Sequence, residues 1–155
     1  MTRLALVGST REFQAFIEAA FTGGAPLEID RTEVSGFDPV VVDGLVAADP
    51  DLVAVGPDLA DDDALKLIEA IDHAAPHIGC ILVATATPEL WPLALRAGAR
   101  DIVAPLSGEA TLRESFERAI EAGRRLRGVV GSSAEPEGGR VITVISAKGG
   151  SGKTT

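Results

Sequence analysis

Short apolar segments alternate with helix-like segments along most of the chain, and this alternation strongly limits the possible fold. Strands without a polar face must be buried on both sides, which happens in parallel sheets covered by helices. We therefore predict an α/β fold with a five-stranded, parallel, doubly wound sheet. One segment is partly polar, which favours a sheet edge. The expected strands are Leu4–Gly8, Leu27–Val34 (the polar one), Asp51–Gly56, Ile78–Ala84 and Asp101–Ala104.

Residues that commonly start helices follow these strands. Ser9 opens a capping-box signature, and Thr87 stands directly before a proline at the first helical position. Asp61–Asp63 and Ser107 are expected to begin two further helices. The segment Phe37–Ala48 fits a strand or a buried helix, and its length favours a helix. The helix after Thr87 has a predicted apolar side made of Leu90, Trp91, Leu93, Ala94 and Leu95.

Composition excludes several classes of function. The 155 residues carry a net charge of −9, which argues against nucleic-acid binding. Cys80 is the only cysteine, so no disulfide framework or paired metal site is expected, and a buried thiol is the simpler interpretation. Neither a signal peptide nor an apolar run of membrane-spanning length is recognisable. We expect a cytoplasmic protein without stable membrane insertion.

Three segments resemble the receiver domains of response regulators. Pro50–Val55 resembles the third receiver strand, Leu82–Ala86 the fourth, and Ala97–Pro105 the segment around the fifth. The resemblance covers roughly residues 3 to 125. It implies a CheY- or flavodoxin-like architecture for a first domain, residues 1–125.

The phosphorylation chemistry of the family is missing at the matching positions. The acidic pair that holds Mg²⁺ falls on Gly8 and Ser9, the phosphoryl acceptor on Gly56, and the lysine on Ala104. Thr85, at the position of the family's switch threonine or serine, is the one functional position that keeps the family's residue type. The resemblance therefore implies a degenerate pocket without catalytic residues or metal.

Asp58 is the one nearby acid that could replace the acceptor. A hard divalent cation needs several clustered oxygen ligands, and Asp58 has no partner acids in the sequence. A turn residue after Pro57 is the simpler interpretation. Two alternatives stay open: a receiver phosphorylated on Asp58, and a small-molecule sensor that binds near Gly8, Gly56 and Thr85.

The chain ends in a glycine-rich segment that follows the apolar run Val141–Ile145. Ala147 stands where the usual phosphate loop has glycine, and the string resembles the K-G-G-x-G-K-[ST] variant of ParA/MinD ATPases. The resemblance implies that glycine N–H groups and two lysines contact ATP, and that a threonine binds Mg²⁺. The residues concerned are Lys148, Gly149, Gly150, Gly152, Lys153, Thr154 and Thr155.

We expect this segment to be inactive here, because the helix that should follow it is not in the sequence. Residues 126–140 are the expected linker, and residues 141–155 the first strand and phosphate loop of an ATPase domain. The tail is expected to be disordered or extended. No cofactor is expected for this chain, and ATP with Mg²⁺ for the full-length protein.

A receiver-like domain joined to a deviant phosphate loop resembles the CpaE/TadZ family of pilus-assembly proteins. The resemblance implies a localisation and interaction module for Flp/Tad-type pili, with protein partners, homodimerisation and a place at the cell pole. In receiver domains the last helix, the last strand and the helix before it commonly form the dimer face, so the resemblance makes Trp91, Leu95, Ile102 and residues of the final helix the candidate contact residues. For Trp91, a position in the core is the simpler interpretation. A MinD- or ParA-like regulator of division or partitioning is the alternative, and the sequence does not separate the two.

Overall fold

The structure, a computed structural model, describes residues 2–24 and 26–133, in which strands and helices strictly alternate. The phosphate-loop residues 148–155 and the run 141–145 lie outside this part. The strands are β1 (Thr2–Val7), β2 (Leu27–Thr32), β3 (Leu52–Val55), β4 (Gly79–Val83) and β5 (Asp101–Val103). The helices are α1 (Arg11–Ala20), α2 (Pro39–Ala48), α3 (Asp61–Ala74), α4 (Leu90–Ala97) and α5 (Glu109–Ser133).

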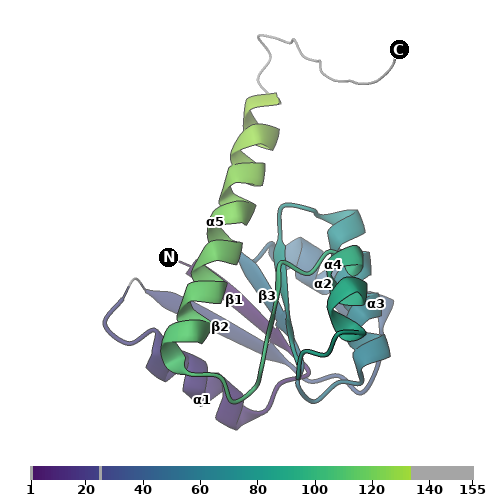
Figure 1. The fold of residues 1–155 in the computed structure, drawn as a ribbon. Coiled ribbons are helices and arrows are strands. Elements are labelled where there is room, and N and C mark those ends of the chain that lie inside the picture. The colour runs from purple at the N-terminus through teal and green to yellow at the C-terminus, as the bar shows by residue number, and fades with distance from the viewer. Residues whose placement is uncertain (1, 25, 134–155) are drawn as a thin grey trace. The chain divides into compact units, whose positions relative to one another are not determined.

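The five strands form one parallel sheet in the order β2-β1-β3-β4-β5 (Figure 1). This arrangement confirms the predicted fold class. The partly polar strand β2 is an edge strand, as its composition predicts. The ambiguous segment 37–48 contains helix α2, as its length favours.

Strand β1 shows why helices cover both faces of the sheet. Successive side chains of a strand point to opposite faces. Ala5 and Val7 therefore belong to the core beneath α2, α3 and α4. Leu4 and Leu6 belong to the core beneath α1 and α5. All four side chains are at most 5% exposed, so this strand alone requires two covering layers (Figure 1).

The helix start predicted at Asp61–Asp63 is confirmed, whereas the one at Thr87 is partly wrong, because α4 begins at Leu90 with Glu89 as its N-cap. The Thr87 hydroxyl accepts a hydrogen bond from the Leu90 backbone N–H at 3.0 Å, as a cap does. Asp61–Asp63 lie in the first turn of α3, where they stabilise the helix dipole. However, Ala60 is the N-cap of α3, and no side chain caps this helix by a hydrogen bond.

The predicted caps at Ser9 and Ser107 are wrong. Thr10 caps α1, since its hydroxyl accepts a hydrogen bond from the Phe13 N–H at 3.0 Å. Ser9 is buried and used elsewhere, as described below. The Ser107 hydroxyl donates instead to the Ala104 carbonyl at 2.9 Å, and α5 begins only at Glu109.

The chain divides into two compact units, Met1–Gly123 and Arg124–Thr155. Helix α5 continues to Ser133, so the beginning of the expected linker 126–140 is helical. In the described residues, no helix is both long and apolar enough to cross a membrane.

Two glycines let α5 lie directly on the beginning of β4. A Cβ atom on Gly123 would stand 2.7 Å from the His77 carbonyl oxygen. One on Gly79 would stand 3.0 Å from the Ala119 carbonyl oxygen. Because both neighbours are backbone atoms, they cannot rotate away as a side chain could. The absence of side chains here sets the distance between helix and sheet.

We predict that Gly123→Ala lowers the free energy of unfolding by about 1–3 kcal/mol, because the methyl group overpacks this contact. Gly128→Ala is the matched control on the same helix, since nothing lies within 4 Å of its added Cβ. That control should stabilise by up to about 1 kcal/mol through helix propensity. Urea unfolding curves measure both effects, and equal midpoints for the two variants would contradict the prediction.

Candidate functional site

The carboxyl ends of β1 and β3 are tied together by three hydrogen bonds. The Gly56 N–H donates to the Val7 carbonyl at 2.8 Å, and the Asp58 N–H donates to the Gly8 carbonyl at 2.7 Å. The buried Ser9 hydroxyl donates to the Gly56 carbonyl at 2.5 Å. The structure thus brings together Gly8, Ser9, Gly56 and Asp58, four positions of the predicted degenerate pocket.

Gly56 leaves no space for a side chain at the acceptor position. Its φ of +102° lies in the region that favours glycine, and an added Cβ would stand 2.5 Å from the Val83 carbonyl oxygen. Gly8 has a φ of +66°, and its Cβ would stand 3.1 Å from Leu59 Cβ. The strand ends are therefore in backbone contact where a receiver holds its acidic side chains.

The backbone contacts of Gly8, Ser9, Gly56 and Val83 form a closed centre at the strand ends. Asp58 lines a shallow hollow beside this closed centre. The hollow has a volume of about 300 Å³, and Arg11, Arg31 and Glu33 also line it. One guanidinium nitrogen of Arg31 contacts a Glu33 carboxylate oxygen at 3.0 Å and the Ser9 carbonyl at 3.1 Å. Within residues 2–24 and 26–133, no group of three His, Cys, Asp or Glu side chains is placed to hold a metal ion.

Thr85 and Ala104 follow β4 and β5 and are exposed. The carbonyl of Ala104 accepts hydrogen bonds from Ser107, from its N–H at 3.1 Å and its hydroxyl at 2.9 Å. In the described part of the chain, no hydrogen bond joins Thr85 or Ala104 to Asp58. These two positions flank the closed centre without contributing a charged group to it.

Cys80 on β4 is a buried thiol, as the sequence predicts, with an exposed fraction of 1%. Burial, assisted by the negative charge of Asp72 and opposed by Arg100, raises the pKa of this thiol to about 12. The thiolate is the reactive form of cysteine, and it is strongly disfavoured here. Cys80 is a core residue.

Helix α4 exposes three of its large apolar side chains. Leu90 and Ala94 are buried, whereas Trp91, Leu93 and Leu95 are 41%, 47% and 49% exposed. Trp91 and Leu95 therefore lie on the surface, as expected of contact residues, and the core interpretation of Trp91 is wrong. A helix of eight residues buries only one narrow stripe. The prediction that Ile102 is a contact residue on the surface is wrong. Its side chain is 9% exposed and lies in the core.

Solved structures of receiver domains have the same architecture. A CheY-like receiver domain from Methanospirillum hungatei superposes with a TM-score of 0.61 at 16% identity, over 81% of this chain and 98% of that one. The fold is that of a receiver domain. No protein-family model and no curated protein matches the sequence.

Two further neighbours of the receiver-like domain come from Burkholderia. A pilus assembly-related protein of B. pseudomallei has a TM-score of 0.63 and 24% identity, over 79% of this chain and 91% of that one. A pilus assembly protein, CpaE, of B. thailandensis has a TM-score of 0.58 and 20% identity, over 78% and 99%. At these identities the likeness extends to the fold.

We predict that Gly56→Ala lowers the free energy of unfolding by about 2–5 kcal/mol, through backbone strain and a clash with the Val83 carbonyl. Gly23→Ala separates the two causes, because Gly23 has a φ of +86° and nothing within 4 Å of its added Cβ. Strain alone should cost that control about 1–2 kcal/mol. Chemical denaturation measures both values, and equal losses would show that the closed centre can relax.

Proposed function

We propose that the receiver-like domain is a protein-interaction module that does not take part in phosphoryl transfer. The observation that carries this proposal is the contact between Gly56 and the Val83 carbonyl. A phosphoryl acceptor requires a carboxylate with room for three phosphoryl oxygens and a metal ion. The acceptor position has neither a side chain nor space for one.

Asp58 is a poor substitute for an acceptor. It is exposed, its backbone N–H is held by Gly8, and its hollow contains Glu33 as well as two arginines. Phosphorylation on Asp58 would place further negative charge beside Glu33, without a clustered set of oxygen ligands for Mg²⁺. The phosphorylation-regulated alternative therefore has weaker support than an interaction role.

Addition of beryllofluoride and Mg²⁺, which together mimic a phosphorylated carboxylate, tests the proposal. We predict that the backbone NMR shifts of Asp58 and Thr85 stay unchanged, because Asp58 has no cluster of acidic side chains around it, among the described residues, to hold Mg²⁺. An Asp58→Asn variant, titrated in parallel, controls for weak binding of the ions elsewhere. A saturable response that the native protein shows and Asp58→Asn loses would favour the phosphorylated alternative.

The exposed apolar residues of α4 are the proposed surface for self-association. Trp91 and Leu95 are one helical turn apart, so their side chains lie on the same side of α4. Large aromatic residues supply much of the binding energy at protein interfaces, particularly when flanked by other apolar groups. A homodimer that buries Trp91 would remove this apolar area from water.

We predict that Trp91→Ala weakens self-association by about tenfold or more, as loss of an interface hot spot does. Val40→Ala, an exposed apolar truncation on α2, should leave it unchanged, since Val40 is 74% exposed outside this surface. Sedimentation equilibrium gives the association constants. Trp91 is the only tryptophan, so its emission should shift to the blue as the dimer forms. Equal constants for the native protein and Trp91→Ala would contradict the proposed surface.

The proposed larger context is a pilus-assembly ATPase. The names of the two Burkholderia neighbours support it, together with the deviant phosphate-loop sequence. In the full-length protein, Lys153 and Thr154 would contact ATP and Mg²⁺, and the receiver-like domain would bind pilus-assembly or polar proteins. A MinD- or ParA-like role in division or partitioning is the alternative. A strain that lacks the gene distinguishes these roles. Loss of pili without a division defect favours the pilus role.

A further inference from the structure

Among residues 2–24 and 26–133, no strand pairs with the outer edge of β2. It pairs with β1 in continuous register, from Thr2 opposite Leu27 to Val7 opposite Thr32, and it is the outermost strand of the sheet. The carbonyls of Pro26 and Thr32 accept hydrogen bonds from the N–H groups of Thr2, at the start of β1, and Gly8, just after its end. Because backbone groups alternate in direction along a strand, those of Leu27, Ile29 and Arg31 point away from β1. These three residues offer a ladder for a further strand.

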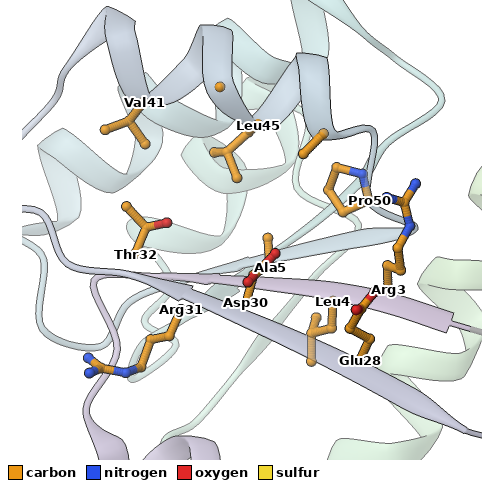
Figure 2. Close-up of a pocket in the computed structure, with 12 residues that line it drawn as sticks. Arg3, Leu4, Ala5, Glu28, Asp30, Arg31, Thr32, Val41, Leu45 and Pro50 are labelled. Carbon is orange, nitrogen blue, oxygen red and sulfur yellow. The ribbon is translucent and has the colours of Figure 1, made fainter.

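The sheet is hollowed on both faces next to this edge. Beneath α2, a groove of about 320 Å³ is walled by Val41 and Leu45, and Glu28 and Asp30 of β2 form part of its floor (Figure 2). On the opposite face, a hollow of about 380 Å³ is lined by Leu27 and Ile29, among others. Neither α1 nor α2 covers β2 completely. An added strand would find space for its side chains on both faces.

The two faces differ in charge. Glu28 and Asp30 are exposed, and neither carboxylate makes an ion pair or hydrogen bond with the described residues. Arg3 lies opposite Glu28 in the strand register, but its guanidinium donates to the Asp49 carbonyl at 2.8 Å. Asp30 lies opposite Ala5 and has no basic neighbour across the ladder. Arg3 and Arg31 also line the groove, but the Arg31 guanidinium is held by the Ser9 carbonyl and the Glu33 carboxylate. The charges of the groove that have no partner among the described residues are therefore those of Glu28 and Asp30, and on the opposite face β2 presents the apolar Leu27 and Ile29.

These charges argue against a second copy of β2 as the added strand. In an antiparallel pair, directly opposed residues point to the same face. In the registers that pair these acids, Glu28 of one copy would stand opposite Asp30 of the other, or one of the two acids would stand opposite its own counterpart. Like charges directly opposed destabilise a strand pair. A strand with basic residues on the groove side has the complementary pattern.

We infer that the β2 edge binds an extended segment of a partner protein in which basic and apolar residues alternate. The basic side chains enter the groove above Glu28 and Asp30, and the apolar ones contact Leu27 and Ile29. Main-chain hydrogen bonds to an edge strand supply affinity, and pockets for alternate side chains supply specificity. The inference rests on the proposed function, that the domain binds proteins, but it uses the sheet edge opposite β5 and not α4.

The probe is a peptide of about eight alternating lysine and valine residues with an acetylated N-terminus and an amidated C-terminus. Its length matches a typical strand. We expect it to shift the NMR signals of β2 in a saturable manner and to slow amide exchange at Leu27, Ile29 and Arg31. A peptide of the same composition with lysines and valines in two blocks should not bind. A peptide with glutamate in place of lysine should not bind either.

Two variants locate the site. Glu28→Lys combined with Asp30→Lys should weaken binding by about tenfold or more, because attractive cross-strand pairs become repulsive. Ile29→Pro removes one outward N–H while leaving the ladder to β1 intact, and should abolish binding. Ile29→Ala is its matched control, since it removes similar apolar contact but keeps the N–H, and it should still bind.

Several results would overturn the inference: no saturable shifts, binding that survives the charge reversal, or shifts centred on α4. Exchange protection of the outward β2 amides that grows with protein concentration without peptide would identify a second copy as the occupant, and would also overturn it. Self-association through Trp91 is measured separately. Loss of peptide binding with that association intact would reject the β2 site alone and leave the proposed function standing.

Discussion

The contact between the ends of β3 and β4 determines what the carboxyl edge of this sheet can do. Gly56 reaches the Val83 carbonyl so closely that no Cβ fits between them, and the Ser9 hydroxyl holds the Gly56 carbonyl from the other side. Backbone atoms therefore fill the centre that a receiver uses for an acidic side chain. In an open α/β sheet this edge is the usual place for ligand chemistry. Here the ends of β1, β3 and β4 pack against one another at this edge.

The fold tolerates this change because its stability comes from other residues. The central strands are buried on both faces, with Leu52 and Ala54 in one core and Val53 and Val55 in the other. Neither core includes Gly56 or Asp58. A sheet held in this way can lose its phosphorylation residues and keep its architecture, because hydrophobic burial is the dominant favourable term in folding.

The fold was predictable from the sequence because strands that are buried on both faces of a sheet are continuous apolar runs, and such runs are visible in the local composition. For α4, the receiver resemblance correctly places Trp91 and Leu95 on the surface, but local composition does not, because Trp91, Leu93 and Leu95 are as apolar as the residues that α4 buries. Only the position of the helix on the sheet decides which of them face solvent. Likewise, Ser9 and Thr10 are adjacent hydroxyl residues, and either fits a helix cap. The bond from Ser9 to Gly56, distant in sequence, makes Thr10 the cap.

At both candidate sites, the sequence predicts the residue types, whereas the space around these residues depends on tertiary packing. The missing acid at position 56 is visible in the sequence once the receiver resemblance is known, but the steric closure depends on Val83, which no local pattern connects to it. The alternation Leu27-Glu28-Ile29-Asp30 is equally visible and correctly predicts a sheet edge. That this edge lies between two hollows depends on where α1 and α2 pack. If a helix covered the whole of this edge strand, its acidic side chains would be inaccessible. Beside open hollows, the same side chains are exposed to solvent.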